Sequence, residues 1–393
     1  MSRLLIVSFD AVASRVWEEI PDGCLNMAAF AESAESVTGV SSVFLSNTYP
    51  IHCSVITGKL PCDHGVMNNT SPFPEPHPMW TVSAAAIKSK TLWRAASEKG
   101  LKAAAFLWPC TSGSRHIRYN MPEIHPYLGQ NQVVENLKGG SKLMQLSLYL
   151  RHRKKLADFT QPGIDDFTTS CAVDILKSKQ PDLSLVHLLC CDFFGHEHGS
   201  EKEKLMQAYK SLDENLGKLL EAAGDDTSVI VFSDHACPDV HTEYTPNDLL
   251  VEMGLLDKEG ELYKKGKDGC FFECCGGSVF FYPGTLDEEK INEVLEEAAR
   301  LEGISRFLSD EELETSGRSG VPFGFGLKSG YSASSEPTGH KGNHGYPLDT
   351  PDYCVFYAVR GKGFTPGARR RGGSLLDIAP IAASILGIDN WED

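Results

Sequence analysis

The chain has 393 residues, of which 41% are hydrophobic and 9% aromatic, and its formal net charge is −16 at pH 7. This composition excludes a disordered chain, and the length predicts more than one structural unit. The negative charge disfavours nucleic acid polymers and anionic membranes as partners, and no apolar run reaches the ~20 residues that a membrane span needs. We therefore expect a protein that acts on a small molecule, and a small nucleotide is not excluded.

Apolar runs alternate with helical patterns along the chain, which predicts an α/β fold with a mostly parallel sheet and helices on both faces. The expected strands are 4–9, 103–107, 183–189, 228–232 and 354–358. The expected helices are 91–99, 167–179, 202–223 and 375–386.

Two segments interrupt this alternation. Residues 247–336 contain a strand at 277–282, a charged helix at 286–300 and a Gly/Ser-rich exit, so we expect an inserted cap subdomain on a catalytic core of residues 1–246 and 337–393. A helical insertion at about 115–160 carries the basic run RHRKK. Such a run is most often a solvated helix face, and the alternative is a rim that attracts anions.

The chain opens with MSRLLIVSFD, which leaves no room for a signal peptide and predicts a cytoplasmic protein unless a leader was trimmed. The twelve cysteines are accordingly expected to be reduced thiols. Cys270, Cys274 and Cys275 cluster in GCFFECCGG without paired C-x-x-C spacing. We expect them to pack in the interior rather than to bind metal.

Six potential metal ligands and one threonine are spread along the chain: Asp10, Thr48, Asp192, His196, Asp234, His235 and His344. Several follow apolar runs, as in LLIVSFD, LSLVHLLCCD and SVIVFSDH, and the ends of strands are where an α/β sheet presents side chains to a ligand. Carboxylates and imidazoles are ligands for zinc and similar divalent ions, and six are too many for one catalytic ion that keeps an open position. We expect two ions, which together can polarise a phosphoryl group.

Thr48 is the candidate nucleophile. It lies in SNTYPIHCSVITG, where Pro50 marks the first turn of an expected helix and the threonine hydroxyl lies at the N-terminal end. The helix dipole favours an incoming anion at this end, and we expect Thr48 itself to bind a metal ion, which stabilises its alkoxide.

These segments resemble the alkaline phosphatase superfamily and, within it, the nucleotide pyrophosphatase/phosphodiesterase family. The matching segments are LLIVSFDAV, SNTYPIHCSVITGKLPCDHGVMNN, CDFFGHEHG, FSDHAC and GNHGY, with looser similarity in KTLWRAASEKGLKAAAFLWP. The resemblance implies an alkaline-phosphatase-like fold, a nucleophilic Thr48 and an Asn69 amide that points at a phosphoryl oxygen. It also implies one zinc ion held by Asp192, His196 and His344 and a second held by Asp10, Asp234 and His235.

Three differences from related enzymes bear on metal binding and on the expected substrate. The chain reads DHAC where many relatives read DHGM, but the ligating atoms are unchanged, so we expect metal binding to survive. A sulfatase of the superfamily would have a cysteine or serine at the position of Thr48, followed by a proline-arginine pattern. This chain has neither, so a sulfatase is disfavoured. A dedicated monoesterase would place an arginine near the nucleophile, whereas Tyr49, Pro50 and Ile51 follow Thr48. This pattern favours a phosphodiester or pyrophosphate bond.

Other residues are candidates for substrate contacts or for support of the ligands. We expect Asn69, Tyr49 and His198 to bind substrate, and the apolar group of a diester to meet aromatic side chains drawn from Tyr49, Phe73, Trp80, Phe271, Phe272 and Phe323. His52 and His64 are candidates to orient ligands, and His187 is expected to be a hydrogen-bonded core histidine. A phosphonate hydrolase or a phosphomonoesterase of the same superfamily stays open, and a non-enzymatic metal protein leaves the threonine unexplained.

Overall fold

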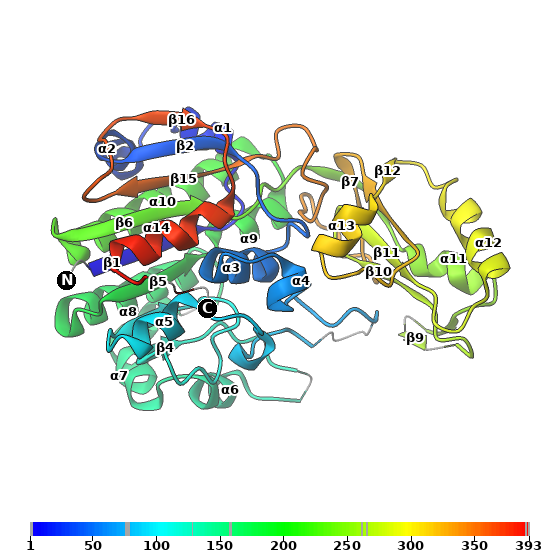
Figure 1. Ribbon diagram of the computed structural model, residues 1–393, viewed down its shortest axis with the longest axis horizontal. Coiled ribbons are helices and arrows are strands. Elements are labelled where there is room, and N and C mark those ends of the chain that lie inside the picture. Colours follow the sequence, from blue (N-terminus) through cyan, green and yellow to red (C-terminus); the bar gives the residue numbers. More distant parts are fainter. Residues whose placement is uncertain are drawn as a thin grey trace.

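A computed structural model describes residues 3–74, 79–127, 129–156, 159–260, 262–264, 266–389 and 391. Its centre is an eight-stranded sheet in which only β15 runs antiparallel to its neighbours, which confirms the predicted α/β class with a mostly parallel sheet (Figure 1). The strands, in spatial order, are β16 (Arg369–Arg371), β2 (Glu35–Val40), β15 (Val355–Arg360), β6 (Thr227–Ser233), β1 (Arg3–Phe9), β5 (Leu183–Leu188), β3 (Ala103–Phe106) and β4 (Tyr119–Met121).

Helices cover both faces of this sheet because its central strands are apolar on both sides. Along β1, Leu4 and Ile6 join one buried cluster, while Leu5 and Val7 join another. The first cluster is closed by α3 (Thr48–Thr57), α5 (Leu92–Glu98) and α14 (Ile378–Ile385). The second is closed by α1 (Ser14–Glu18), α2 (Leu25–Ser33), α8 (Gly163–Lys179), α9 (Cys190–His198) and α10 (Lys202–Ala223).

The elements expected from the sequence lie where predicted, with two corrections. The insertion at 115–160 is not purely helical, because β4 within it pairs with β3 and completes the edge of the main sheet before α6 (Gln132–Gly139) and α7 (Lys142–His152). Asp192 does not end a strand, because β5 stops at Leu188 and the chain turns directly into α9.

The region after β6 builds a smaller unit around a four-stranded antiparallel sheet, seen at the right of Figure 1. Its strands, in spatial order, are β10 (Phe271–Cys274), β11 (Ser278–Tyr282), β13 (Phe323–Leu327) and β12 (Ile304–Phe307). The helices of this region are α11 (Pro246–Glu252), α12 (Glu288–Ala298) and α13 (Asp310–Thr315). Phe272 and Phe323 are buried here, so they serve as core residues rather than substrate platforms.

The predicted cap limits at 247 and 336 remain a prediction. β7 (Val240–Tyr244) lies before the first limit, in the predicted core, and β14 (Gly330–Ala333) lies within the predicted cap. The two strands pair in parallel, so the core and the cap share a short sheet. Short elements complete the described chain: α4 (Pro61–His64), β8 (Asp257–Glu259), β9 (Leu262–Lys264) and the 3₁₀ turns Ala84–Ala86, Arg153–Leu156 and Leu375–Asp377. None of the described helices is long and apolar enough to cross a bilayer.

Candidate active site

Two neighbouring strands bring the first group of candidate ligands together. Asp10 follows β1, and Asp234 and His235 follow β6, which pairs in parallel with β1. The carboxyl ends of parallel neighbours meet at one sheet edge. Donor atoms of these three residues all lie within 4.8 Å of one another, and all three side chains are buried.

The second group combines a helix and a loop. Asp192 and His196 lie one turn apart on α9, with Asp192 Oδ1 3.3 Å from His196 Nε2. His344 comes from the loop that follows β14, and donor atoms of the three residues lie within 4.8 Å of one another. The rings of His344 and His235 stack with centroids 4.0 Å apart, so the two groups adjoin.

Three carboxylate oxygens in these groups are buried and accept no hydrogen bond from the described residues: Asp10 Oδ1, Asp192 Oδ1 and Asp234 Oδ2. Each instead faces an imidazole nitrogen at 3.3 to 3.4 Å. Burial, reinforced by the charges of Asp234 and Asp192, raises the pKa of Asp10 well above its usual range. Unpartnered buried oxygens and crowded carboxylates are costly alone and are relieved by a cation. The donor set therefore fits divalent metal ions.

Hydrogen bonds orient the ligand side chains toward this centre. His344 Nδ1 lies 2.8 Å from Asn47 Oδ1, and His196 Nδ1 lies 2.9 Å from the Gly342 carbonyl. In both histidines Nε2 is thereby left toward Asp192, as expected when a second partner fixes a ligating imidazole. Burial lowers the pKa of His344 well below its ordinary value, which favours the neutral form that binds metal.

Thr48 is the first residue of α3, as predicted, and its Oγ1 lies 3.3 Å from His235 Nε2. Asn69 Oδ1 accepts the Tyr49 N–H at 2.8 Å, which leaves the two amide N–H groups of Asn69 as donors. Pro50 has no N–H, and Ile51 N–H donates to the Asn47 carbonyl. Beyond Thr48, the first turn of the helix thus offers its dipole to an anion but no free donor.

Two buried histidines support these residues. His52 Nδ1 lies 2.8 Å from the Thr48 carbonyl, and burial lowers its pKa to about 3. His187 is a core histidine, as expected, but its Nε2 also lies 3.0 Å from Asp10 Oδ2. The sequence contained no signal for this last contact or for the role of Asn47. His64 instead contacts Ser54 Oγ of α3 at 3.0 Å and accepts the Val66 N–H in its own turn at 3.2 Å.

A comparison with known proteins identifies the family. The model of the type I phosphodiesterase/nucleotide pyrophosphatase family matches residues 4–344. The chain belongs to this family. It is therefore a hydrolase of the nucleotide pyrophosphatase/phosphodiesterase type, as the resemblance of its motifs predicted.

Individual relatives are distant but extend over most of the chain. Bis(5'-adenosyl)-triphosphatase ENPP4 of Mus musculus is 23% identical over 98% of this chain and 78% of its own length. Ectonucleotide pyrophosphatase/phosphodiesterase family member 7 of Homo sapiens is 23% identical over 67% of this chain and 58% of its own length. The solved structure of murine ectonucleotide pyrophosphatase/phosphodiesterase 5, inactive and in complex with AMP, superposes with a TM-score of 0.70 at 16% identity, covering 99% of this chain and 96% of that one. This match confirms the fold.

In this phosphodiesterase, a cavity of about 360 Å³ adjoins the second ligand group. Core and cap both line it, with His196 and His344 at one side and Phe73, Glu273 and His340 among the others. Of the expected substrate contacts, Tyr49 is fully buried, with its ring 5.4 Å from that of Trp80. His198 lines a separate cavity together with Glu197, Asp239, His241 and Lys341.

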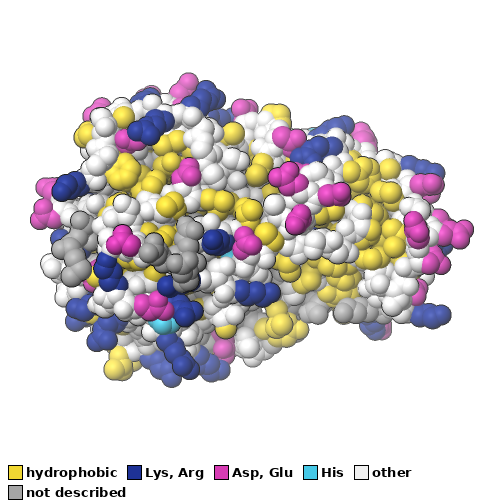
Figure 2. Space-filling view, in the orientation of Figure 1, with side chains coloured by type: hydrophobic (Ala, Val, Ile, Leu, Met, Phe, Trp, Pro, Cys, Tyr) yellow, Lys and Arg dark blue, Asp and Glu magenta, His cyan; other side chains and the backbone are white. Residues whose placement is uncertain are grey.

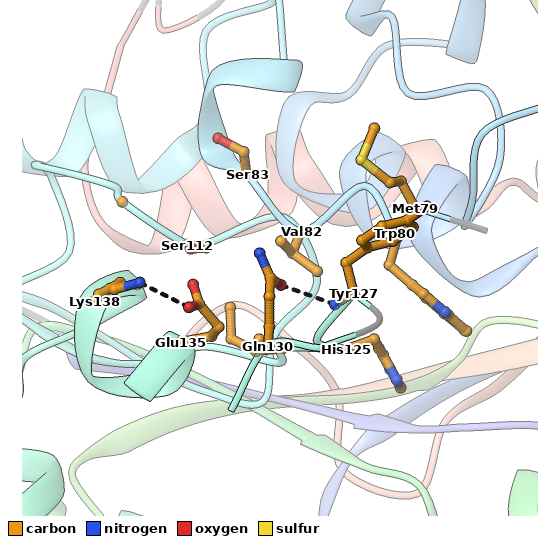
Figure 3. A pocket seen from close by; sticks show the side chains of 13 residues that line it. Met79, Trp80, Val82, Ser83, Ser112, His125, Tyr127, Gln130, Glu135 and Lys138 are labelled. Carbon is orange, nitrogen blue, oxygen red and sulfur yellow. Dashed lines mark hydrogen bonds and ion pairs between the residues drawn. The ribbon is translucent and has the colours of Figure 1, made fainter. Parts of the chain in front are cut away.

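A third cavity, of about 350 Å³, is lined by Trp80 and His125 among other residues (Figure 3). The Trp80 ring stacks on His125 with centroids 3.8 Å apart, so the wall is aromatic. Opposite them in Figure 3, Lys138 pairs with Glu135 at 2.8 Å. Trp80 thus connects this cavity to the residue that follows the candidate nucleophile.

A chain of hydrogen bonds leads from the cap to His344. Asn47 Nδ2 donates to Asn68 Oδ1 at 2.8 Å, and Asn68 Nδ2 donates to Glu273 Oε1 at 2.8 Å. Arg318 closes the chain with two bonds to the Glu273 carboxylate, at 2.7 and 2.9 Å. Burial opposes the charge of Glu273, but Arg318 lowers its pKa overall. Both charges are buried and paired, and Arg318 is therefore not free to clamp a phosphate.

The cysteines behave as structural thiols. All twelve are among the described residues, and none forms a disulfide. Cys270 and Cys275 are buried in two different apolar clusters of the cap, and neither they nor Cys274 belong to a group of potential metal donors among the described residues. Cys270 and Cys275 thus pack in the interior and Cys274 packs against the cluster of Cys270, while the expectation that they bind no metal and the cellular location remain predictions.

Proposed function

We propose that the protein hydrolyses a phosphodiester or pyrophosphate bond of a small nucleotide through a phosphothreonine intermediate on Thr48, with two divalent ions, zinc, as cofactors. One observation carries the proposal. The Thr48 hydroxyl lies at a helix N-terminus beside two adjoining donor groups, in which three buried carboxylate oxygens accept no hydrogen bond from the described residues. The stability of the fold does not require six potential metal ligands around this hydroxyl.

Asp192, His196 and His344 would hold one ion, and Asp10, Asp234 and His235 the other. When bound, the ions supply positive charge that polarises the phosphoryl group and favours ionisation of the threonine hydroxyl. Thr48 Oγ1 gives up its proton to water and forms a bond to phosphorus while the bond to the leaving-group oxygen breaks, and that oxygen takes up a proton from water. Water then displaces Thr48 from phosphorus in a second in-line step and restores the hydroxyl.

Asn69 stabilises the charge that builds on the phosphoryl oxygens. Its carbonyl oxygen is held by the Tyr49 N–H at 2.8 Å, so the amide is fixed before substrate arrives. The free N–H groups then act as a preorganised donor, the arrangement that contributes most when charge develops in the transition state.

The substrate class rests on the surroundings of Thr48 and on the relatives. Arg318 is neutralised by Glu273, so it cannot balance the extra charge of a monoester. The second organic group of a diester finds aromatic surface in the Trp80 and His125 stack. Relatives are named as triphosphatase of bis(5'-adenosyl) substrates and as phosphodiesterases, which favours a nucleotide over a phosphonate.

The nucleophile is tested by Thr48→Ala and Thr48→Ser, with Thr57→Ala as the matched control in the same helix, where the hydroxyl donates to the Cys53 carbonyl. We expect Thr48→Ala to keep both ions and the fold while kcat falls at least about 1,000-fold, and Thr48→Ser to retain part of the activity. Mass spectrometry of quenched wild-type enzyme should detect phosphate on Thr48. Turnover by Thr48→Ala near the wild-type rate would show that water attacks directly.

The substrate class is tested by comparing an aryl or nucleotidyl phosphodiester with the matching monoester and with phosphonoacetate. We expect the diester to have the highest kcat/KM. A preference of tenfold or more for the monoester, about 1.4 kcal/mol of transition-state discrimination, would overturn the diesterase assignment and leave the hydrolase intact.

A further inference from the structure

Helix α7 is apolar on its outward face as well as on its inward face. The inward face packs on α8 and buries Leu148 and Gln145, which are 2% and 8% exposed. Its outward face carries Leu143 and Leu150, which are 85% and 60% exposed, with Leu146 between them. These leucines recur at i, i+3 and i+7 and so lie on one side of the helix. Leu148 anchors α7 to the core, but folding alone does not explain three exposed leucines on the opposite side.

More apolar side chains lie close to this stripe. Helix α6 packs against α7 and exposes Val133 and Val134, and Tyr149 of α7 is also exposed. Isolated exposed apolar residues need no explanation, but a concentration of them on one helical hairpin marks an interaction surface.

The same segment is basic, although the chain as a whole carries a net charge of −16. Residues 136–156 contain no Asp or Glu and six basic residues: Lys138, Lys142, Arg151, Arg153, Lys154 and Lys155. Figure 2 shows Lys and Arg side chains gathered at the lower left, over the part of the molecule where Figure 1 places α7. Lys138 and Arg151 pair with Glu135 and Asp174, whereas the other four form no ion pair with the residues that the structure describes.

We propose that the outward face of α7 (Leu143, Leu146, Tyr149 and Leu150) and the basic turn after it (Arg153, Lys154 and Lys155) form a docking surface for an anionic lipid bilayer. Leucines that enter the headgroup region beside lysines and arginines that meet anionic headgroups are the features of helices that lie on a membrane. The 11 residues of α7 rise only ~16 Å, too short to span.

Charge distribution decides between this partner and others. Two copies of the chain that met face to face would bring their basic turns together, which opposes a symmetric dimer. A nucleic acid would use the basic residues but gain nothing from the leucines. The net charge led us to expect no membrane partner. However, salt screening at physiological ionic strength limits the range of interactions between exposed charges to about 8 Å. The basic residues next to α7, rather than the net charge of the chain, therefore govern contact with an anionic surface.

The proposal is tested with the full-length chain in co-sedimentation with phosphatidylcholine vesicles that contain either 30% phosphatidylserine or none. We expect binding to the anionic vesicles only, and at least tenfold weaker binding in 0.5 M salt. Leu143→Ser/Leu146→Ser/Leu150→Ser and Arg153→Gln/Lys154→Gln/Lys155→Gln should each weaken binding at least tenfold. The matched controls are Leu25→Ser, at a leucine that is 74% exposed on α2, and Arg369→Gln/Arg370→Gln/Arg371→Gln, at three exposed arginines of β16. Both controls should bind as the wild type does.

Three results would overturn the proposal. They are no sedimentation with anionic vesicles, equal binding to vesicles without phosphatidylserine, or equal binding by wild type and both α7 variants. Light scattering on the wild type and on the leucine variant separates a second copy from a lipid surface. A wild-type dimer that the three serine substitutions dissociate would assign this face to self-association and refute the lipid proposal.

Discussion

The eight-stranded core and the cap contribute to the candidate site in different ways. The core supplies all six proposed ligands and Thr48: three ligands follow the ends of β1 and β6, and the other three lie on α9 and in the loop after β14. The cap supplies Glu273 and Arg318, which connect to His344 through Asn68 and Asn47, and Gly277, whose N–H donates to the His344 carbonyl at 2.8 Å. The chemical groups thus come from one part of the chain, while a buried hydrogen-bond chain from the other part helps to hold them.

Removing a core ligand should have the largest effect. Asp234→Ala replaces a carboxylate that lies among the donors of the first group, so we expect loss of an ion and a fall in kcat/KM of at least about 1,000-fold. The control is Asp213→Asn, a buried carboxylate that binds Asn26 and the Met27 N–H far from the donor groups. This control should lose stability but keep its ions. Near wild-type activity of Asp234→Ala would show that the ligands of the core take no part in the reaction.

A cap substitution should act through stability. Glu273→Gln leaves the Arg318 guanidinium buried without its partner charge, and breaking a buried pair in this way costs about 3–5 kcal/mol. The same change at the exposed Lys177–Glu221 pair, Glu221→Gln, should cost less than about 1 kcal/mol. Chemical denaturation measures both. Equal losses of unfolding free energy in the two variants would show that the buried Glu273–Arg318 pair stabilises the protein no more than an exposed pair does.

The same division explains how far the sequence could be interpreted. Core strands are continuous apolar runs, and β1 and β6 end just before functional residues, so these two strands, β5 and most candidate ligands were predictable. Asn47, Asn68 and Glu273 were not, because an amide or a carboxylate far from the nucleophile in sequence gives no sign of its partner. Tyr49 was misjudged for a related reason, because an aromatic residue next to the nucleophile can point into the core.

The junction between the two parts should respond to acid. His64 ends α4, which packs against α13 of the cap, and burial lowers its pKa to about 4. The unfolded chain binds the proton more readily, so the stability from neutral His64 is complete above about pH 6.5 and is lost as the pH falls toward 4. His64→Gln should remove about 3 kcal/mol of this pH dependence. Parallel pH profiles for wild type and His64→Gln would contradict this account.

The smallest effect is expected at His198, two residues from a proposed ligand. Because it lines a separate cavity, His198→Ala should change kcat/KM less than about twofold, a difference below about 0.5 kcal/mol. His340→Ala provides the contrast, since its ring lies 4.3 Å from that of His196 and it lines the cavity beside the ligands. Steady-state kinetics with the diester would contradict the assignment of the cavities if His198→Ala were the more impaired variant.

The central claim, that the core holds two metal ions in two adjoining groups, is tested most directly by elemental analysis of zinc-saturated protein after removal of excess metal. The wild type should contain two ions per chain. Asp192→Ala, which removes the carboxylate of the second group and leaves Asp10, Asp234 and His235 intact, should contain one. Saturation of the wild type at one ion, or two ions retained by Asp192→Ala, would contradict the account.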